Sequence, residues 1–339
     1  MFRSGVFKIL LTTFFTLIIF GLQMYAQDYK KVKAKSGQGI YALLRENGLE
    51  GTDNYDKFIE LNKKSLGAEP QLIKGKTYLL PVANKKKTET PDRTGVYPIF
   101  GDNYEKVEFK DDLLKGAVFY IVSGHGGPDP GAMGKKDGHT LCEDEYAYDV
   151  ALRLARNLLE HNATVNILIT DPNDGIRDDQ YLKCDKDEYC GDKQEIPLNQ
   201  VKRLKQRTKE INTIFNKYRG SYQRMIELHV DSRYSGQKID IFFYHHPDSK
   251  PGKKFSTTMY NLIKAKYDEH QPSRGYHGTV ESRSLYMLNN SKPIGSYIEL
   301  GNINHELDQK RLLIVDNRQA VANWLMLGII KDFENSKKK

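Results

Sequence analysis

Residues 117–132 read AVFYIVSGHGGPDPGA. The first six of these residues are apolar, and a short apolar run bounded by turn-forming residues is typical of a buried β-strand. His125 follows this run in a loop rich in glycine and proline. Because ligands of open α/β sheets gather at the carboxyl ends of the strands, His125 is a candidate functional residue.

Similar apolar runs recur along the chain at residues 165–169, 225–228, 239–244 and 297–300. Between the runs, apolar residues follow a helical spacing, as at positions 147, 150, 151, 154 and 158. This alternation predicts an α/β domain over residues 96–335, with a mostly parallel sheet flanked by helices. The sequence leaves open whether the edge strands are antiparallel.

A smaller unit precedes this domain. Residues 28–83 contain a strand-like start, two helical apolar spacings and a second strand-like run, which together predict a small α+β domain of the order strand, helix, helix, strand. Residues 84–95 are charged and polar and contain Pro91 and Gly95, so we expect a linker there.

The first 26 residues have the layout of a secretory signal peptide. Arg3 and Lys8 precede an uncharged stretch at residues 9–22, which is shorter than the roughly 20 residues that span a bilayer. We therefore expect cleavage after Ala26 and export to the periplasm or cell envelope. An uncleaved segment that anchors the protein in the membrane is the alternative, because Met24 is a poor residue at the −3 position.

The composition is that of an ordinary folded protein and excludes collagen-like, disordered and polytopic membrane classes. The chain has 339 residues, with Lys+Arg 52 against Asp+Glu 44 and a net charge of +8, and this modest excess does not indicate nucleic acid as a partner. It has three cysteines, too few for a disulfide framework. A local disulfide between Cys184 and Cys190, with Cys142 left over, is one hypothesis, and the sequence leaves open whether these two cysteines pair.

Two further polar residues stand at the ends of predicted strands. His229 follows the run at residues 225–228, and Glu299 lies near the end of the run at 297–300. Two histidines and one carboxylate around an open fourth position form the ligand set of a catalytic zinc ion. Glu143 and Glu145, at the start of a predicted helix, are both candidates for the carboxylate. Cys142 is an alternative thiolate ligand. Because residues adjacent in sequence rarely bind one metal from a helix start, we interpret it as a neighbour of the site.

The loop at residues 124–132, a glutamate that opens a helix, Arg207 in a helix before His229, and the sequence Glu-Leu-Gly at 299–301 resemble the zinc-dependent N-acetylmuramoyl-L-alanine amidases. The resemblance spans about residues 117–333. It implies that Zn²⁺ is held by three ligands and that one further residue is the catalytic acid/base. The implied metal ligands are His125, Glu143 and His229. The implied catalytic acid/base is Glu299. It also implies hydrolysis of the amide bond between N-acetylmuramic acid and L-alanine in peptidoglycan, in cell-wall remodelling or cell separation.

The chain departs from the family pattern at Asp231, where asparagine is usual, and at Asn302, where phenylalanine is usual. Residues 178–195 form an apparent insertion, which we interpret as a solvated acidic loop, with a lid or regulatory flap as the alternative. Its Asp185-Lys186-Asp187 start does not continue as a calcium-binding loop, because Tyr189 occupies the fifth position.

The N-terminal unit resembles a lysin motif (LysM) domain, in the order of residues 36–38, 61–62 and 72–81. This resemblance implies binding to the N-acetylglucosamine-containing glycan of cell walls, and a generic module without a ligand is the alternative. The expected partner is therefore peptidoglycan, and a protein activator is left open. Two other functions also stay open: a noncatalytic peptidoglycan-binding or activator protein, and a zinc peptidase that cuts within the stem peptide.

Overall fold

The computed structural model describes residues 29–35, 37–49, 52–66, 70–81, 93–234 and 236–338. The chain divides into two compact units, residues 1–87 and 88–339. The predicted signal peptide, residues 1–26, lies outside the described residues. Among the helices of the described ranges, none combines the length and the apolar character that crossing a membrane requires.

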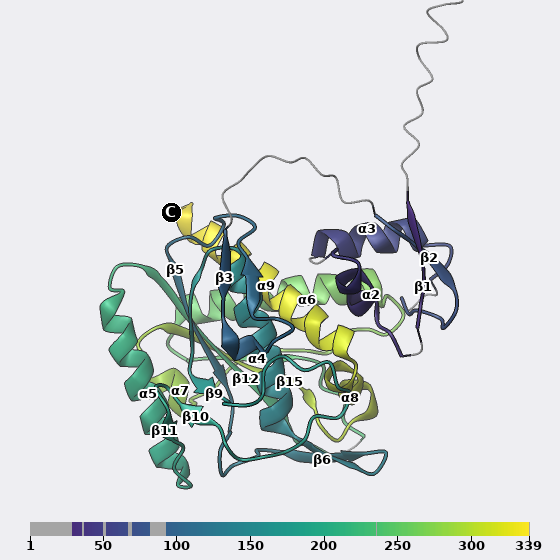
Figure 1. The fold of residues 1–339 in the computed structure, drawn as a ribbon. Helices are drawn as coiled ribbons and strands as arrows, with labels where there is room; N and C mark the ends of the chain where they lie inside the picture. Colours follow the sequence, from purple (N-terminus) through teal and green to yellow (C-terminus); the bar gives the residue numbers. More distant parts are fainter. Residues whose placement is uncertain are drawn as a thin grey trace, which may run out of the picture. The chain divides into compact units, whose positions relative to one another are not determined.

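The first unit is a small α+β structure with the predicted order strand, helix, helix, strand (Figure 1). Its elements are β1 (Lys30–Lys33), α2 (Ile40–Glu46), α3 (Thr52–Asn62) and β2 (Thr77–Leu80). The two strands pair in antiparallel orientation. The buried Asn62 amide joins α3 to β2, because it donates to the carbonyl of Leu79 and accepts from the Leu79 N–H, both at 2.8 Å.

The second unit contains a six-stranded sheet with the order β14-β13-β15-β12-β5-β8. Its strands, in chain order, are β5 (Ala117–Ser123), β8 (Thr164–Ile167), β12 (Tyr222–Asp231), β13 (Phe242–His245), β14 (Val280–Ser282) and β15 (Ile294–Asn302). β8, β5, β12 and β15 are mutually parallel, whereas β13 is antiparallel to β15 and parallel to β14. The predicted mostly parallel sheet is confirmed, and its antiparallel strands lie at one side.

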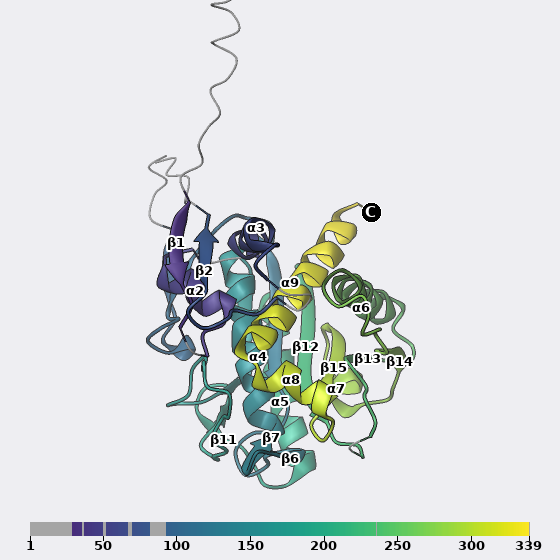
Figure 2. The ribbon, with the colours of Figure 1, turned by 90° about the vertical axis from the view of Figure 1, so that its right-hand side faces the viewer.

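Helices cover both faces of this sheet (Figures 1 and 2). The helices are α4 (Glu143–Glu160), α5 (Gln200–Lys217), α6 (Lys250–His270), α7 (Tyr286–Asn290), α8 (Glu306–Leu313) and α9 (Val315–Lys337). α4, α6 and α9 pack on one face, and α5 and α7 on the other.

The strand β5 is apolar throughout because both of its faces are covered. Successive side chains of a strand point to opposite faces. Phe119 and Ile121 accordingly pack in the core with α4, while Val118 and Tyr120 pack in the core with α5.

Smaller strands surround the sheet. They are β3 (Thr94–Val96) with β4 (Lys106–Glu108), β6 (Met133–Lys136) with β7 (His139–Cys142), and β9 (Ile169–Thr170), β10 (Tyr189–Cys190) and β11 (Gln194–Glu195) in one three-stranded sheet. A short 3-10 helix, Pro98–Phe100, follows β3. β3 pairs with β4, so Thr94 and Gly95, which the sequence assigns to the linker, lie in the first hairpin of the second unit.

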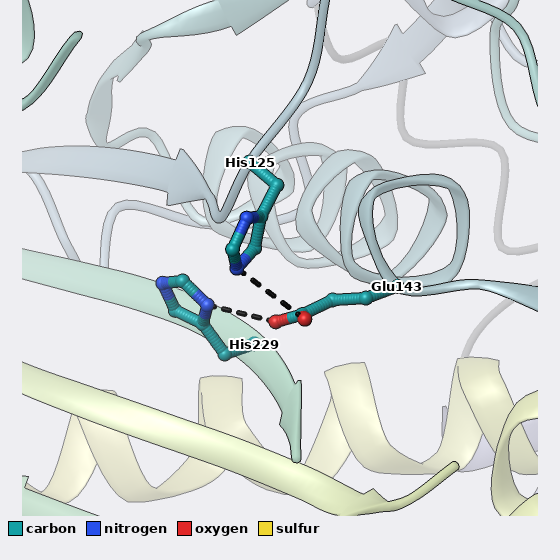
Figure 3. A group of neighbouring side chains, drawn as sticks. All are labelled: His125, Glu143 and His229. Carbon is teal, nitrogen blue, oxygen red and sulfur yellow. Dashed lines mark hydrogen bonds and ion pairs between the residues drawn. The ribbon is translucent and has the colours of Figure 1, made fainter. Parts of the chain in front are cut away.

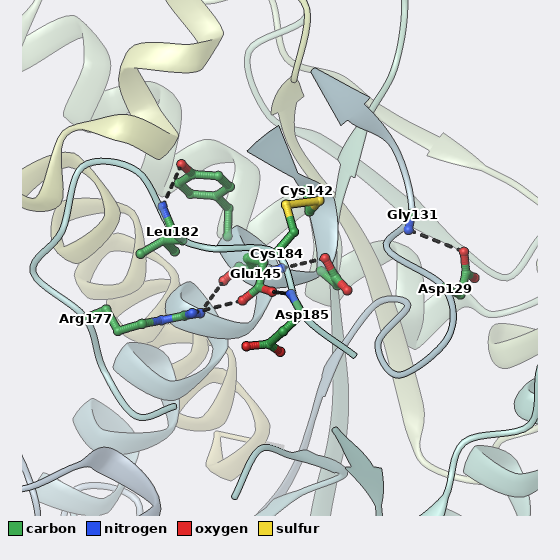
Figure 4. The surroundings of a disulfide bond; sticks show 10 residues. Asp129, Gly131, Cys142, Glu145, Arg177, Leu182, Cys184 and Asp185 are labelled. Carbon is green, nitrogen blue, oxygen red and sulfur yellow. Dashed lines mark hydrogen bonds and ion pairs between the residues drawn. A yellow bond between two sulfur atoms is a disulfide. The ribbon is translucent and has the colours of Figure 1, made fainter. Parts of the chain in front are cut away.

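The cysteine pairing differs from the prediction. Cys142 forms a disulfide with Cys184, and Cys190 is a free, buried thiol (Figure 4). The hypothesis of a Cys184–Cys190 disulfide is therefore wrong. The physical reason is that Cys190 lies in β10, where its side chain packs with Ile169 and Ile196, whereas Cys184 lies in the preceding loop, beside the first turn of α4.

We expect the Cys142–Cys184 disulfide to stabilise the second unit. It joins residues 42 positions apart. Closing a loop of that length stabilises a fold by about 4 kcal/mol in the chain-entropy model. Denaturant unfolding should show that C142S/C184S loses about 2–4 kcal/mol, while C190A, the matched control, keeps the crosslink. A nonreduced peptide map in which Cys184 is linked to Cys190 would contradict the assignment.

Candidate metal centre

Three side chains from separate segments converge at the carboxyl end of the sheet (Figure 3). His125 follows β5, Glu143 is the first residue of α4, and His229 lies in β12. One ligand atom from each of these residues lies within 4.8 Å of the others. The structure thus brings together the three residues that the sequence analysis named as metal ligands.

Two glycines of the loop after β5 make this approach sterically feasible. A Cβ atom at Gly124 would overlap the imidazole ring of His229. A Cβ atom at Gly131, whose φ is +70°, would lie 2.5 Å from Oε2 of Glu143 and 2.7 Å from Cδ2 of His125. The glycines of this motif therefore provide the space in which the three side chains meet.

Glu143 is the centre of the group. Its Oε1 lies 2.8 Å from Nδ1 of His229, and its Oε2 lies 3.3 Å from Nε2 of His125. Zinc bonds of about 2.0–2.1 Å in a tetrahedron place ligand atoms about 3.3 Å apart, which the contact with His125 matches. The contact with His229 is a direct hydrogen bond, which a bound ion would replace. The same carboxylate accepts backbone hydrogen bonds from Val230 at 2.9 Å and Ala132 at 2.7 Å.

The electrostatics keep Glu143 ionised. Burial raises the pKa of Glu143, but hydrogen bonds and charge interactions with His125 and His229 outweigh burial and hold the pKa well below its ordinary value. Burial lowers the pKa of His229, and hydrogen bonds to Glu143 and Glu227 raise it to about 10. A histidine between two carboxylates holds a proton that a bound metal ion would replace, because metal ligation needs the neutral imidazole.

A carboxylate supports each histidine from the side away from Glu143. Oδ2 of Asp129 lies 2.8 Å from Nδ1 of His125, and Oε1 of Glu227 lies 3.3 Å from Nε2 of His229. Such carboxylate contacts orient metal-binding imidazoles and raise their basicity. Sequence reasoning missed both roles. The period of two in a strand, which places residues 227 and 229 on the same face of β12, could have indicated Glu227.

Glu299 lies on β15, in register opposite His229 on the neighbouring strand. Its side chain is buried, and within the described residues its Oε2 has no hydrogen-bond partner. Burial raises the pKa of Glu299 to about 7, with Glu143 and Asp231 adding to the rise and His229 opposing it. Glu299 is thus a carboxyl group beside the candidate metal ligands that can both accept and release a proton near neutral pH.

Residues 120–331 match the sequence model of the N-acetylmuramoyl-L-alanine amidase family Amidase_3. The chain belongs to this family. The match begins within β5 and ends within α9, and it includes all four predicted site residues. No curated protein matches the chain.

Solved amidase structures are similar to parts of this amidase. The CwlD amidase from Clostridioides difficile, in complex with the GerS lipoprotein, is 18% identical, with a TM-score of 0.47 over 64% of this chain and 98% of that chain. AmiC2 of Nostoc punctiforme is 18% identical, with a TM-score of 0.44 over 66% and 98%. Ami1 from Mycobacterium smegmatis is 14% identical, with a TM-score of 0.45 over 66% and 99%.

Glu145 and Cys142, the alternative metal ligands that the sequence suggests, form other interactions in the structure. Glu145 forms an ion pair with Arg177 at 2.9 Å and accepts the backbone N–H of Asp185 at 2.9 Å. Cys142 is in the disulfide and has no thiolate to offer. Arg207, which carries part of the family resemblance, is buried in α5 and donates to the backbone carbonyl of His125, so it holds the histidine loop in place.

The contact between Glu227 and His229 gives a testable expectation. The variant E227Q removes the charge behind the imidazole and keeps its volume, so zinc affinity should fall about 10–100-fold. Competition with a chromogenic chelator measures this affinity. The matched control is E334Q, an exposed glutamate in α9. Equal zinc affinities of E227Q and E334Q would refute the supporting role of Glu227.

Proposed function

We propose that this family member is a zinc-dependent N-acetylmuramoyl-L-alanine amidase, which hydrolyses the bond between the lactyl group of N-acetylmuramic acid and the L-alanine of the stem peptide. One observation carries the proposal: the ligand atoms of His125, Glu143 and His229 lie within 4.8 Å of one another. Amidase chemistry follows from the family, and the two-histidine, one-carboxylate set is the zinc ligand set that leaves a fourth position for water.

The proposed roles of the side chains follow from their surroundings. A zinc ion held by this set would lower the pKa of a bound water to about 7 and polarise the amide carbonyl. Glu299 takes the proton of the attacking water and delivers it to the departing amine, which cannot leave without a proton. Its pKa of about 7 suits both transfers. Asp129 and Glu227 keep the imidazoles in place.

We infer that this reaction takes place outside the cytoplasm. Peptidoglycan is assembled in the cell envelope, and the layout of residues 1–26 indicates export to the periplasm or envelope, with a cell-wall role in remodelling or cell separation. The N-terminal unit would act as a LysM-type glycan-binding module. Its strand–helix–helix–strand order and the Asn62 link between α3 and β2 are consistent with that role.

Incubation with purified peptidoglycan tests the function. Free stem peptides that begin with L-alanine, identified by mass, are the expected product. Intact peptidoglycan would indicate a noncatalytic binding or activator protein instead. Stem peptides cut internally would indicate a zinc peptidase.

Removal of the Glu299 carboxylate should separate metal binding from turnover. We expect E299Q to retain the zinc content of the unmodified protein, because this residue is not a ligand in the proposal. The rate of stem-peptide release should fall about 10²–10⁴-fold through loss of the proton acceptor. Inductively coupled plasma emission spectroscopy measures the zinc content of each protein. The matched control is E334Q, which should keep both its zinc content and its turnover. Undiminished turnover of E299Q would disprove the acid/base role.

Deletion of residues 28–83 tests the glycan-binding module. Binding of one module to the wall raises the local concentration of the other. The shortened chain should therefore sediment less with insoluble peptidoglycan and digest it more slowly, while its rate on a small soluble muropeptide stays unchanged. Equal sedimentation of the two chains would show that this unit does not bind the wall.

A further inference from the structure

A second group of carboxylates lies next to the metal centre, on three segments of the chain. Its six members are the following: Asp144 and Glu145 in the first turn of α4, Asp171 directly after β9, and Asp185, Asp187 and Glu188 in the loop before β10. Oxygens of Asp144, Glu145 and Glu188 lie within 4.8 Å of one another, as do those of Asp171, Asp185 and Glu188. Glu188 belongs to both sets and makes them one acidic cluster.

Most of the acidic cluster is withdrawn from solvent. Asp144 is 2% exposed, Glu145 1%, Glu188 5% and Asp171 8%. Within the described residues, Oδ2 of Asp144 has no hydrogen-bond partner, and the same holds for Oδ1 of Asp185 and of Asp187. Buried polar atoms without a partner are uncommon in folded proteins, so three carboxylate oxygens of one cluster in this state need a partner that the described part of the protein does not supply.

The protein supplies little positive charge to the cluster. In the part of the chain that the structure describes, the one ion pair to these six side chains joins Arg177 to Glu145 at 2.9 Å (Figure 4). Burial and neighbouring carboxylates raise the pKa of Asp171 to about 6 and that of Asp185 to about 7. Like charges held this close are unfavourable without a cation between them.

We propose that the acidic cluster is a calcium-binding site centred on Glu188, separate from the zinc centre. Every donor is an oxygen, which suits a hard cation and not zinc, whose preferred ligands include nitrogen and sulfur. Ca²⁺ binds six to eight oxygens at about 2.3–2.6 Å, so its ligand oxygens lie no more than about 5 Å apart. The oxygens of each set lie within 4.8 Å of one another, which is close enough to share such an ion. Mg²⁺ usually keeps several waters and uses one or two carboxylates.

The position of the site gives the cation a structural role. Oε2 of Glu188 accepts the backbone N–H of Gly127 at 2.6 Å, two residues after His125. Asp144 adjoins Glu143 in the chain, and the Cys142–Cys184 disulfide ties the acidic loop to the same helix start. A calcium ion here would link the loop at 184–189, the start of α4 and the end of β9, and would stabilise the segments that hold the proposed zinc ligands.

Calcium titration of the full, zinc-loaded chain after treatment with a calcium-removing resin tests the proposal. Calorimetry should detect saturable Ca²⁺ binding. At a hundredfold excess over Kd the Tm should rise by about 5–10 °C, with a smaller rise for Mg²⁺ at the same concentration. Zinc content is measured in each sample. No calcium binding at millimolar concentration, or Ca²⁺ binding that excess Zn²⁺ abolishes by competition, would overturn the proposal.

Variants locate the site. E188Q and D185N should weaken Ca²⁺ binding at least tenfold and reduce the calcium-dependent rise in Tm. D192N, an exposed aspartate of the same segment, is the matched control and should bind as the unmodified chain does. Unchanged calcium affinity in E188Q would refute the assignment. The titration of the unmodified chain decides the question if a variant does not fold, and loss of amidase activity leaves its outcome unaffected.

Discussion

The carboxylate of Glu143 joins the segments from which the centre is built. Its two oxygens contact His125 and His229 and accept the backbone N–H groups of Ala132 and Val230. A buried charge is tolerated in a protein only when it is paired and hydrogen-bonded. Glu143 meets this condition only if the loop after β5, the start of α4 and the end of β12 are all in place, so the geometry of the centre and the integrity of the local fold depend on each other.

The parallel sheet positions the other side chains of the site. Neighbouring parallel strands end at the same edge, which brings His229 of β12 and Glu299 of β15 into register. Alternation along β12 places Glu227 behind His229, on the same face. The roles that we propose in metal ligation, in support of a ligand and in proton transfer therefore fall on residues whose spacing the backbone determines. Rigid strands hold these positions better than loops do.

Two other links also involve the first turn of α4, the helix that Glu143 begins. The Cys142–Cys184 disulfide and the acidic cluster both attach the segment before β10 to the first turn of α4. One link is covalent, and the other is the group of carboxylates that we propose to bind calcium. The segment at 178–195, interpreted from sequence as a solvated acidic loop, is exposed at both of its ends and buried at Leu182, Glu188 and Cys190.

Local sequence patterns predicted a large part of the fold and of the candidate site. Apolar runs located the strands, and the polar residues after them pointed to His125, His229 and Glu299, because strand burial and strand ends leave a signal in neighbouring residues. The alternation along the strand at 225–229 also indicates Glu227, but the partner of Cys184 and the grouping of Asp144, Asp171 and Glu188 left no such signal. They depend on distances between segments far apart in the chain, and those distances are established only when the sheet and its helices pack.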